Sequence, residues 1–441
     1  MPTQRQFTVL LLAVIAVILA LAPAGIQARP VSGTRTLVIL EQVAAKSQFS
    51  TFLTGLQDRG YDLQYKSADS SDLGLIEFDE IAYDHLLVLA PTVGSFGGEL
   101  GVGTLLEFVN KGGNVLLAAS SQISEAIRDF AYEFSADFDE AGSAVYDHFN
   151  KAEGSEDGTL IAASNFGRSS SAIPTGLAPV LFRGVGHRLT GKNPLMQPLL
   201  MGSPTAYAYE IADTDAVEGQ PLLGDGLVLV SALQARNNAR VTFTGSAEMF
   251  ADELINQRVG GKQSGNGKFV DELAKWTFQE KGVLKVVSKK HHRENETAQH
   301  GIYRIKDDMV YEITIAEWTG SAWAPFTATD LQFEAVMLDP YIRTALKPSS
   351  TGTFSTHFRL PDHYGVFTFK VDYRRHGRTW VTETETVQIR PYRHDQYPRF
   401  LTAAMPYYTN VFSLAAAFVL FSAVFLWNRE VPAAGKKLKA L

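Results

Sequence analysis

The residues best suited by type and spacing to catalysis are Ser120 and Ser121, followed by the pair Asp147-His148. The serines come directly after the apolar segment 114–119, which we expect to be a strand, and doubly wound sheets carry their sites at the carboxyl ends of strands. A serine nucleophile needs a base, and the aspartate-histidine pair could supply one. The segment lacks the flanking glycines of a nucleophile elbow, however. We therefore expect serine here to cap the helix that follows rather than to attack a substrate.

A glycine-rich stretch is the second place where chemistry is conceivable. Its glycines follow an apolar segment and precede a helical pattern, where a phosphate can meet a helix N-terminus. They are Gly94, Gly97, Gly98, Gly101 and Gly103. A dinucleotide fingerprint requires fixed glycine intervals in the first strand-to-helix turn, and these intervals differ. We interpret the stretch as a connecting loop.

The remaining candidate metal ligands have simpler interpretations. Asp213-Thr214-Asp215 resembles the aspartate pair that holds a metal in some sugar-nucleotide transferases, but it lies among turn residues, where acids are common. His291 and His292 are adjacent in an extended segment, so their side chains point apart, and a polar interdomain linker explains them. The 441 residues include no cysteine and therefore no thiolate nucleophile, disulfide or cysteine metal site. We predict no catalytic, cofactor-binding or metal-binding residue.

Two short motifs concern processing. Asn295-Glu296-Thr297 is an N-glycosylation acceptor sequence, and it falls in the expected linker, where an enzyme could reach it. Lys437 and Lys439 stand fifth and third from the carboxyl terminus. They resemble the dilysine signal that retrieves type I membrane proteins to the endoplasmic reticulum. We predict a glycosylated Asn295 and a retrieval signal formed by the two lysines.

Both ends of the chain indicate membrane targeting. Residues 1–28 combine Arg5, an apolar run and small residues up to Ala28, the pattern of a cleaved signal peptide. Residues 409–427 are uncharged and nearly as long as the 20 or so residues that cross a bilayer. The tail 428–441 is rich in lysine, which marks it as cytosolic. The prediction is a single-pass type I protein of the endoplasmic reticulum membrane with its bulk in the lumen.

Composition and periodicity bound the lumenal part. A formal net charge of −7 and a pI near 5.8 give no basic face for nucleic acid. Strand and helix patterns alternate between residues 36 and 119 and continue less cleanly to residue 280. We expect an α/β region at 29–282, of one or two subdomains, with a mostly parallel, flavodoxin-like or glutamine-amidotransferase-like sheet. A linker at 283–301, a β-sandwich at 302–395 and a stalk at 396–408 would follow, with hairpins at 309–326 and 365–389.

The sequence also resembles a known family, the 48 kDa subunit of the dolichyl-diphosphooligosaccharide protein glycosyltransferase. The resemblance covers essentially all of the mature chain. It is carried by Leu-Pro-Asp-His-Tyr-Gly-Val-Phe at 360–367 and by matching stretches at 66–69, 181–186, 233–240, 282–284 and 406–408. Stretches of this length are more specific than any short catalytic pattern in the chain.

The resemblance implies a non-catalytic accessory subunit of the oligosaccharyltransferase complex. That complex transfers oligosaccharide from dolichyl pyrophosphate to Asn-X-Ser/Thr of nascent proteins, with its active site in a separate polytopic subunit. The implied partners are that catalytic subunit, the ribophorins, small membrane subunits and the endoplasmic reticulum membrane. A contact with the lipid-linked oligosaccharide stays open, and no cofactor is implied. The alternatives are a membrane-anchored lumenal hydrolase or amidotransferase-like enzyme, and a cargo receptor.

Overall fold

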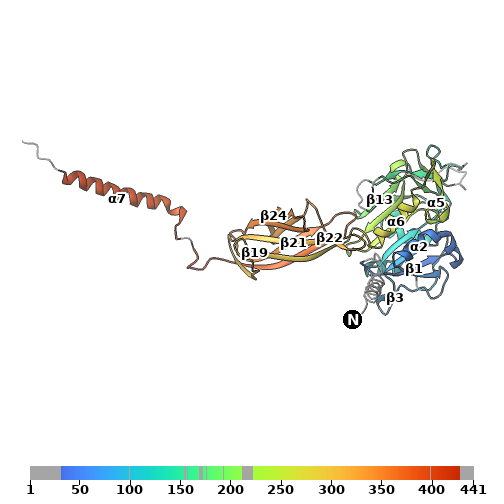
Figure 1. Cartoon of the computed structure of the whole chain (residues 1–441), viewed down its shortest axis with the longest axis horizontal. Coiled ribbons are helices and arrows are strands. Elements are labelled where there is room, and N and C mark those ends of the chain that lie inside the picture. Colours follow the sequence, from blue (N-terminus) through green and yellow to red (C-terminus); the bar gives the residue numbers. More distant parts are fainter. Residues whose placement is uncertain are drawn as a thin grey trace, which may run out of the picture.

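The computed structural model describes residues 31–427 except for 99, 153–154, 156, 168–171, 175, 192, 211–221 and 398. Figure 1 shows a mixed α/β domain, a β-rich second domain beside it, and a long helix at the end of a connecting segment. These three parts correspond in kind to the α/β region, the sandwich and the apolar span that the sequence predicts.

One large sheet organises the first domain, in the order β10-β13-β15-β16-β6-β5-β1-β2. Its parallel half consists of β1 (Arg35–Leu40), β2 (Asp62–Ser67), β5 (His85–Leu89), β6 (Asn114–Ala118) and β16 (Arg240–Thr244). The antiparallel half consists of β15 (Val228–Gln234), β13 (Met196–Met201) and β10 (Asn165–Phe166), with β12 (His187–Leu189) beside β15 and β7 (Ala136–Phe138) beside β12.

The expectation of a mostly parallel sheet is therefore wrong for half of the sheet. The turn 235–239 joins β15 directly to β16, and so short a connection can only produce antiparallel neighbours. Next to β15, the pairing of β13 shifts register at Pro198, which interrupts the alternation that a sequence pattern depends on.

Helices cover both faces of this sheet. On one face lie α2 (Ser50–Asp58), α5 (Asp252–Asn256), α6 (Asn266–Thr277) and the short helices η1 (Val43–Phe49) and η3 (Glu248–Phe250); on the other lie α3 (Val102–Asn110) and α4 (Glu125–Glu133). Successive residues of β1 alternate between the two cores: Val38 and Leu40 face α2 and α6, whereas Leu37 and Ile39 face α3 and α4. A strand buried on both faces reads as a continuous apolar run.

Short elements complete the first domain. They are the two-stranded pairs β3 (Ile76–Glu77) with β4 (Glu80–Ile81), β8 (Ser143–Tyr146) with β14 (Tyr207–Glu210), β9 (Ile161–Ala163) with β11 (Val180–Phe182), and β17 (Arg258–Val259) with β18 (Lys262–Gln263), and the short helix η2 (Gly224–Gly226).

The second domain is built from two sheets around a single core. One sheet contains β19 (Leu284–Arg293), β21 (Asp308–Trp318), β22 (Trp323–Pro325), β25 (Lys347–Pro348) and β26 (Thr353–Arg359). The other contains β20 (Ile302–Arg304), β23 (Gln332–Met337), β24 (Asp339–Ala345), β27 (Gly365–Tyr373) and β28 (Val381–Arg390). The hairpins β21-β22 and β27-β28 agree with the predicted ones.

The predicted linker at 283–301 is wrong over most of its length. Residues Leu284–Arg293 form β19, which pairs along β21 as an edge strand of one of the two sheets in the second domain. Edge strands are half solvated, so their polar residues resemble those of a linker.

The last described element is α7 (Met405–Leu426), preceded by the short helix η4 (Thr402–Ala404). Together Thr402–Leu426 form the one segment of the described chain that is long and apolar enough to cross a membrane. Its most apolar stretch has a mean hydropathy of 2.0, and none of that stretch is buried against the rest of the protein. At a rise of 1.5 Å per residue, α7 is roughly 33 Å long, close to the thickness of a hydrocarbon core.

Candidate functional site

The carboxyl edge of the parallel half of the sheet is the first place to look for a site. The strand order reverses between β1 and β5, and open α/β sheets bind ligands where such a reversal separates the following loops. Here the two loops are joined: the Glu41 carboxylate after β1 accepts hydrogen bonds from the Thr92 hydroxyl (2.6 Å) and amide (3.2 Å) after β5. These two hydrogen bonds tie the loops together where they leave the sheet.

The N-terminus of α2 also opens at this edge, but a carboxylate of the protein already occupies it. Asp252 accepts hydrogen bonds from the amides of Ser50 (3.1 Å) and Thr51 (2.8 Å) and from the Ser50 hydroxyl (2.6 Å). Burial opposes ionisation, but these bonds outweigh it and lower the pKa of Asp252. Amides at a helix N-terminus attract anions. Their use here ties α5 to α2 and leaves them unavailable to a phosphate.

The glycine-rich loop between β5 and α3 has structural reasons for two of its glycines. A Cβ on Gly97 would lie 2.4 Å from the carbonyl oxygen of Ser70, and Gly98 has a φ of +63°. The loop therefore packs against the backbone after β2 in a conformation that favours glycine. Gly94, Gly101 and Gly103 have open space around them.

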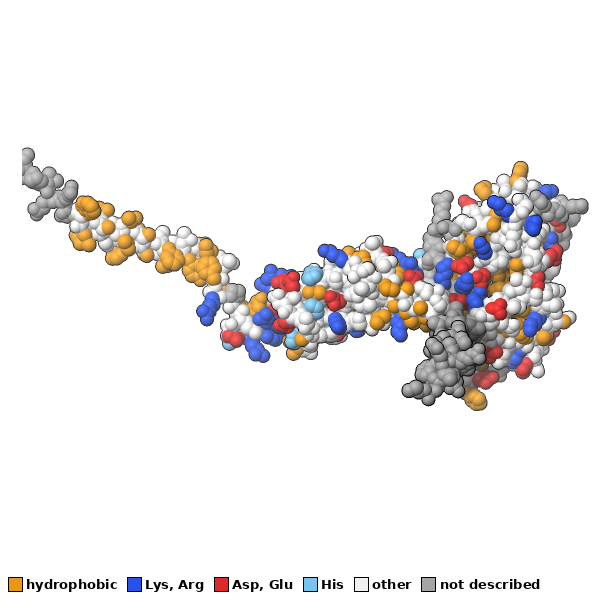
Figure 2. All heavy atoms as spheres, viewed as in Figure 1, with side chains coloured by type: hydrophobic (Ala, Val, Ile, Leu, Met, Phe, Trp, Pro, Cys, Tyr) orange, Lys and Arg blue, Asp and Glu red, His pale blue; other side chains and the backbone are white. Residues whose placement is uncertain are grey.

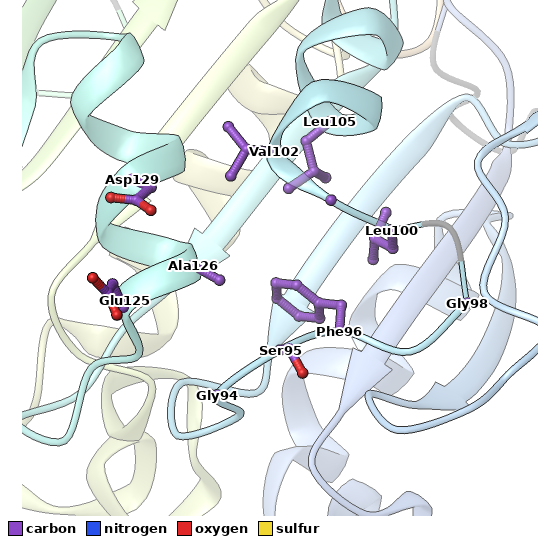
Figure 3. Close-up of a pocket in the computed structure, with 11 residues that line it drawn as sticks. Gly94, Ser95, Phe96, Gly98, Leu100, Val102, Leu105, Glu125, Ala126 and Asp129 are labelled. Carbon is purple, nitrogen blue, oxygen red and sulfur yellow. The ribbon is translucent and has the colours of Figure 1, made fainter.

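A surface cavity of about 580 Å³ lies beside this loop. Figure 3 shows Phe96 from the loop and Leu105 from α3 on one side, with Glu125 and Asp129 of α4 across from them. The only ionisable side chains among the lining residues are these two carboxylates, which repel a phosphate rather than attract it. The described residues around the cavity therefore include no cation of the kind that phosphate recognition normally uses.

Ser120 and Ser121 lie after β6 and are engaged locally. The Ser120 hydroxyl accepts the amide of Gln122 at 3.2 Å, and the Ser121 carbonyl accepts the amide of Gly142 at 2.7 Å. The expectation that one of them caps the following helix is wrong by a few residues, because Ser124 is the N-cap of α4 and accepts the amide of Ile127 at 3.4 Å. Within the described chain no hydrogen bond joins either serine to His148.

Asp147 is a structural acceptor rather than a partner for a catalytic histidine. Its buried carboxylate accepts from the hydroxyls of Ser203 and Thr205, from the side chain and amide of Asn150, and from the amide of Phe149. Burial opposes its ionisation, yet these donors together lower its pKa. An acceptor so fully bonded holds a loop in place.

His148 points instead to the strand β14. Its Nε2 lies 3.0 Å from the hydroxyl of Tyr207, and the Tyr207 ring stacks on Tyr146 at 5.6 Å. The residues of the serine hypothesis are therefore divided among separate local networks.

His291 and His292 lie on β19 and have different surroundings. His291 is buried, with Nδ1 2.8 Å from the Tyr303 hydroxyl and Nε2 3.2 Å from the Glu385 carboxylate; burial lowers its pKa. His292 bonds its neighbour's carbonyl, that of Arg293, at 2.8 Å. No group of three or more histidine, aspartate or glutamate residues in the described ranges is arranged to hold a metal ion.

Of the predicted processing sites, one lies within the described chain. Asn295 is exposed in the turn after β19, and Glu296 beside it pairs with Arg293 (3.1 Å) and His300 (2.7 Å). Lys437 and Lys439 lie outside the described residues, as does Asp213-Thr214-Asp215.

The functional element that sequence reasoning missed is the joint between the two domains. Arg240, fully buried at the start of β16, donates to the carbonyls of Trp276 (2.6 Å), Lys281 (2.7 Å) and Gly282 (2.9 Å). The Trp276 indole donates to the carbonyl of Gly377, in the β27-β28 turn, at 2.9 Å.

Further bonds cross the same joint. The Gln234 amide donates to the carbonyl of Arg378 (2.6 Å), and the amide of Trp380 donates to the Asn238 side chain (2.7 Å). A Cβ on Gly282 would lie 2.4 Å from the carbonyl oxygen of Gly377, so the two backbones meet closely. The stretches 233–240 and 282–284 build this joint, and both belong to the family resemblance, which was the one available signal.

The fold and these residues define a class: a two-domain protein with a hydrogen-bonded joint and a C-terminal helix that is long and apolar enough to cross a membrane. The OST48 N-terminal domain model matches residues 27–280, and the OST48 middle domain model matches residues 291–429. The chain belongs to the OST48 family.

Relatives named as the 48 kDa subunit of dolichyl-diphosphooligosaccharide protein glycosyltransferase are similar over nearly their whole length. The Arabidopsis thaliana protein is 41% identical over 407 residues, which cover 90% of this chain and 93% of that protein. The Caenorhabditis elegans protein is 40% identical over 92% of this chain and 94% of its own length, and the Danio rerio protein is 41% identical over 90% and 92%.

Proposed function

We propose that this protein is a non-catalytic accessory subunit of an oligosaccharyltransferase complex, required for its assembly and full activity. The complex would transfer oligosaccharide from dolichyl pyrophosphate to Asn-X-Ser/Thr of nascent proteins, with the active site in a separate polytopic subunit. The names of the relatives support membership of the complex. The accessory role is supported by one observation: among the candidate catalytic groups, the Asp147 carboxylate is engaged in hydrogen bonds within the protein itself.

The topology that goes with this role has the first 28 residues removed as a signal peptide and both folded domains in the lumen of the endoplasmic reticulum. The helix α7 crosses the membrane, and Lys437 and Lys439 in the cytosolic tail act as the retrieval signal. The exposed turn position of Asn295 supports its use as a glycan acceptor in that compartment.

Within the complex, the protein would act as a brace. Several hydrogen bonds join the two domains, which supports a role in keeping partners of one domain close to partners of the other. On α7, Ala415, Ala416 and Ala417 allow close approach of neighbouring membrane helices.

The test is to purify the complex through a tag on this subunit and assay oligosaccharide transfer to an acceptor peptide. A variant with Ser120→Ala, Ser121→Ala and His148→Ala is compared with the natural chain. We expect the natural chain and the variant each to co-purify with a polytopic subunit, and the two purified complexes to have equal transfer activity. An assembled but inactive complex would support the hydrolase or amidotransferase alternative, and a solitary, inactive protein would support the receptor alternative.

A further inference from the structure

One end of the second domain displays apolar side chains that the described chain leaves exposed. Leu338, at the turn between β23 and β24, is 100% exposed, and Tyr364, just before β27, is 68% exposed. Val366 on β27 and Ile302 on β20 are at least half exposed. We call these four residues the apolar rim.

Strand register places the rim at a single end of the domain. Val366 pairs with Gln388 on β28, which in turn pairs with Ile302, so all three lie in one row across the sheet. A Cβ on Gly365 would lie 2.6 Å from the sulfur of Met337, which brings the loop containing Tyr364 next to the turn containing Leu338. The four side chains thus form one fringe.

This end is also the end at which the chain leaves for α7. The strand β28 ends at Arg390, two residues beyond Gln388, and α7 begins at Met405 (Figure 1). The segment between them continues the apolar exposure with Tyr397, Phe400 and Leu401. The Phe400 ring stacks on Tyr408 in the first turn of α7, with centroids 5.1 Å apart.

Several charges at this end are engaged in local ion pairs, among them Arg293 with Glu296 at 3.1 Å. Lys306 pairs with Asp362 at 2.7 Å, and Arg293 and Arg304 both pair with Asp307, at 2.9 and 3.1 Å. Figure 2 shows blue and red side chains interspersed over this end of the domain. A surface that combines exposed apolar and aromatic side chains with paired charges suits an amphipathic partner such as a lipid headgroup layer.

We propose that the apolar rim rests on the bilayer that α7 crosses, with Leu338 and Tyr364 inserted into its headgroup layer. The proposal relies on α7 being a membrane span, as the proposed function does, and adds a second membrane contact to it. Tyrosine favours the interface because its ring is apolar and its hydroxyl is polar. Two points of attachment, the span and the rim, fix the tilt of the second domain on the membrane.

The absence of cysteine from the 441 residues makes a depth measurement direct. Leu338→Cys in the full chain is labelled with a small fluorophore and reconstituted into phosphatidylcholine nanodiscs containing headgroup spin-labelled lipid. The matched control is Phe78→Cys, because Phe78 shares with Leu338 full exposure and a left-handed backbone but lies in the first domain. We expect strong quenching at position 338 and none above background at 78.

A second comparison separates rim contact from mere tethering by the short connecting segment. In this comparison the fluorophore is attached at Ile302→Cys. The test variant also carries Leu338→Asp and Tyr364→Asp. The control variant carries Val287→Asp instead, at an exposed position nearer the interdomain joint. Replacing each apolar side chain with aspartate should lower the fraction of molecules whose rim contacts the bilayer by roughly tenfold. Quenching should therefore fall with the rim substitutions and persist with the control.

Any one of five results would overturn the proposal. Equal quenching at positions 338 and 78, or quenching at 302 that survives the rim substitutions, would show that the rim does not contact lipid. Quenching that appears only with anionic lipid would show that basic residues, and not the apolar rim, make the contact. A rim that becomes protected only when other subunits are added would identify a protein surface as its partner. A chain that fails to enter nanodiscs at all would refute the membrane span as well, and with it the anchoring in the proposed function.

Discussion

Replacing Arg240 with methionine tests whether the joint is what makes the two domains one body. The buried guanidinium donates to three carbonyls, two of which, those of Lys281 and Gly282, belong to the segment that connects the domains. The third belongs to Trp276 in the last turn of α6, and the cation also lies over the Trp276 ring at 4.7 Å. Burial lowers its pKa to about 9, so the group is still charged at neutral pH.

The expected cost follows from the bonds that are lost. Hydrogen bonds from a charged donor contribute about 1.5 to 3 kcal/mol each, and the buried carbonyls that lose their donor keep their desolvation penalty. Methionine returns part of this through packing and by removing a buried charge. We expect Arg240→Met to destabilise the joint by about 3 kcal/mol, which corresponds to a roughly hundredfold loss of protection.

Hydrogen exchange measures this locally. The amides of Thr379 and Trp380 donate across the joint, to Gly282 and Asn238, and report its opening. Arg236→Met is the matched control, because Arg236 is exposed four residues earlier. Faster exchange at these amides in Arg240→Met but not in the control is the expected result. Equal exchange in both variants, or full retention in Arg240→Lys, would refute the argument from the guanidinium fork.

Three further outcomes are expected. Burial lowers the pKa of His187 to about 3 in the folded protein, whereas the pKa of an unfolded histidine is near 6.5. Between these two values the unfolded chain binds more protons than the folded one, so the free energy of unfolding decreases as the pH falls. At pH 5 the decrease is roughly 2 kcal/mol. His187→Gln should flatten the dependence of melting temperature on pH in this range, and an unchanged slope would contradict this. Replacing Lys437 and Lys439 with serine should move the protein from the endoplasmic reticulum to later compartments, as measured by glycan maturation; unchanged glycans would show that retention comes from elsewhere. Ala416→Leu with Ala417→Leu should reduce co-purification of membrane subunits, whereas undiminished recovery would mean that these alanines face lipid.

The parallel half of the sheet could be predicted because its strands carry strong signals. His85–Leu89 is buried at every position, and a continuous apolar run bounded by turns is typical of such a strand. The helix α2 follows equally clearly from its periodicity. In these elements local pattern and tertiary burial agree.

Other elements gave no such signal. Along β19, most side chains after Leu284 are at least partly exposed. Its last six residues, Ser-Lys-Lys-His-His-Arg at 288–293, therefore resemble a linker. Only pairing with β21 makes this segment a strand, and pairing is not visible in a single sequence.

The candidate chemistry shows the same division. Residue type suggested that Asp147 and His148 act together, but the hydroxyls that bond Asp147 come from Ser203 and Thr205, far along the chain. Arg240 likewise reads as a surface residue until the fold buries it against α6. Such roles depend on contacts between distant segments, which composition and spacing do not encode.

The strand β21 also sets a height. It runs from Asp308, at the rim end, to Trp318, whose amide bonds Val283 beside the joint. Its 11 residues span roughly 36 Å at the usual rise per residue. The second domain therefore separates the first domain from the start of α7 by about this length. An extended loop from a membrane-embedded neighbour would need about eleven residues to reach that far. With the rim on the bilayer, as proposed, a membrane-embedded neighbour contacts the first domain only through a segment of at least this length.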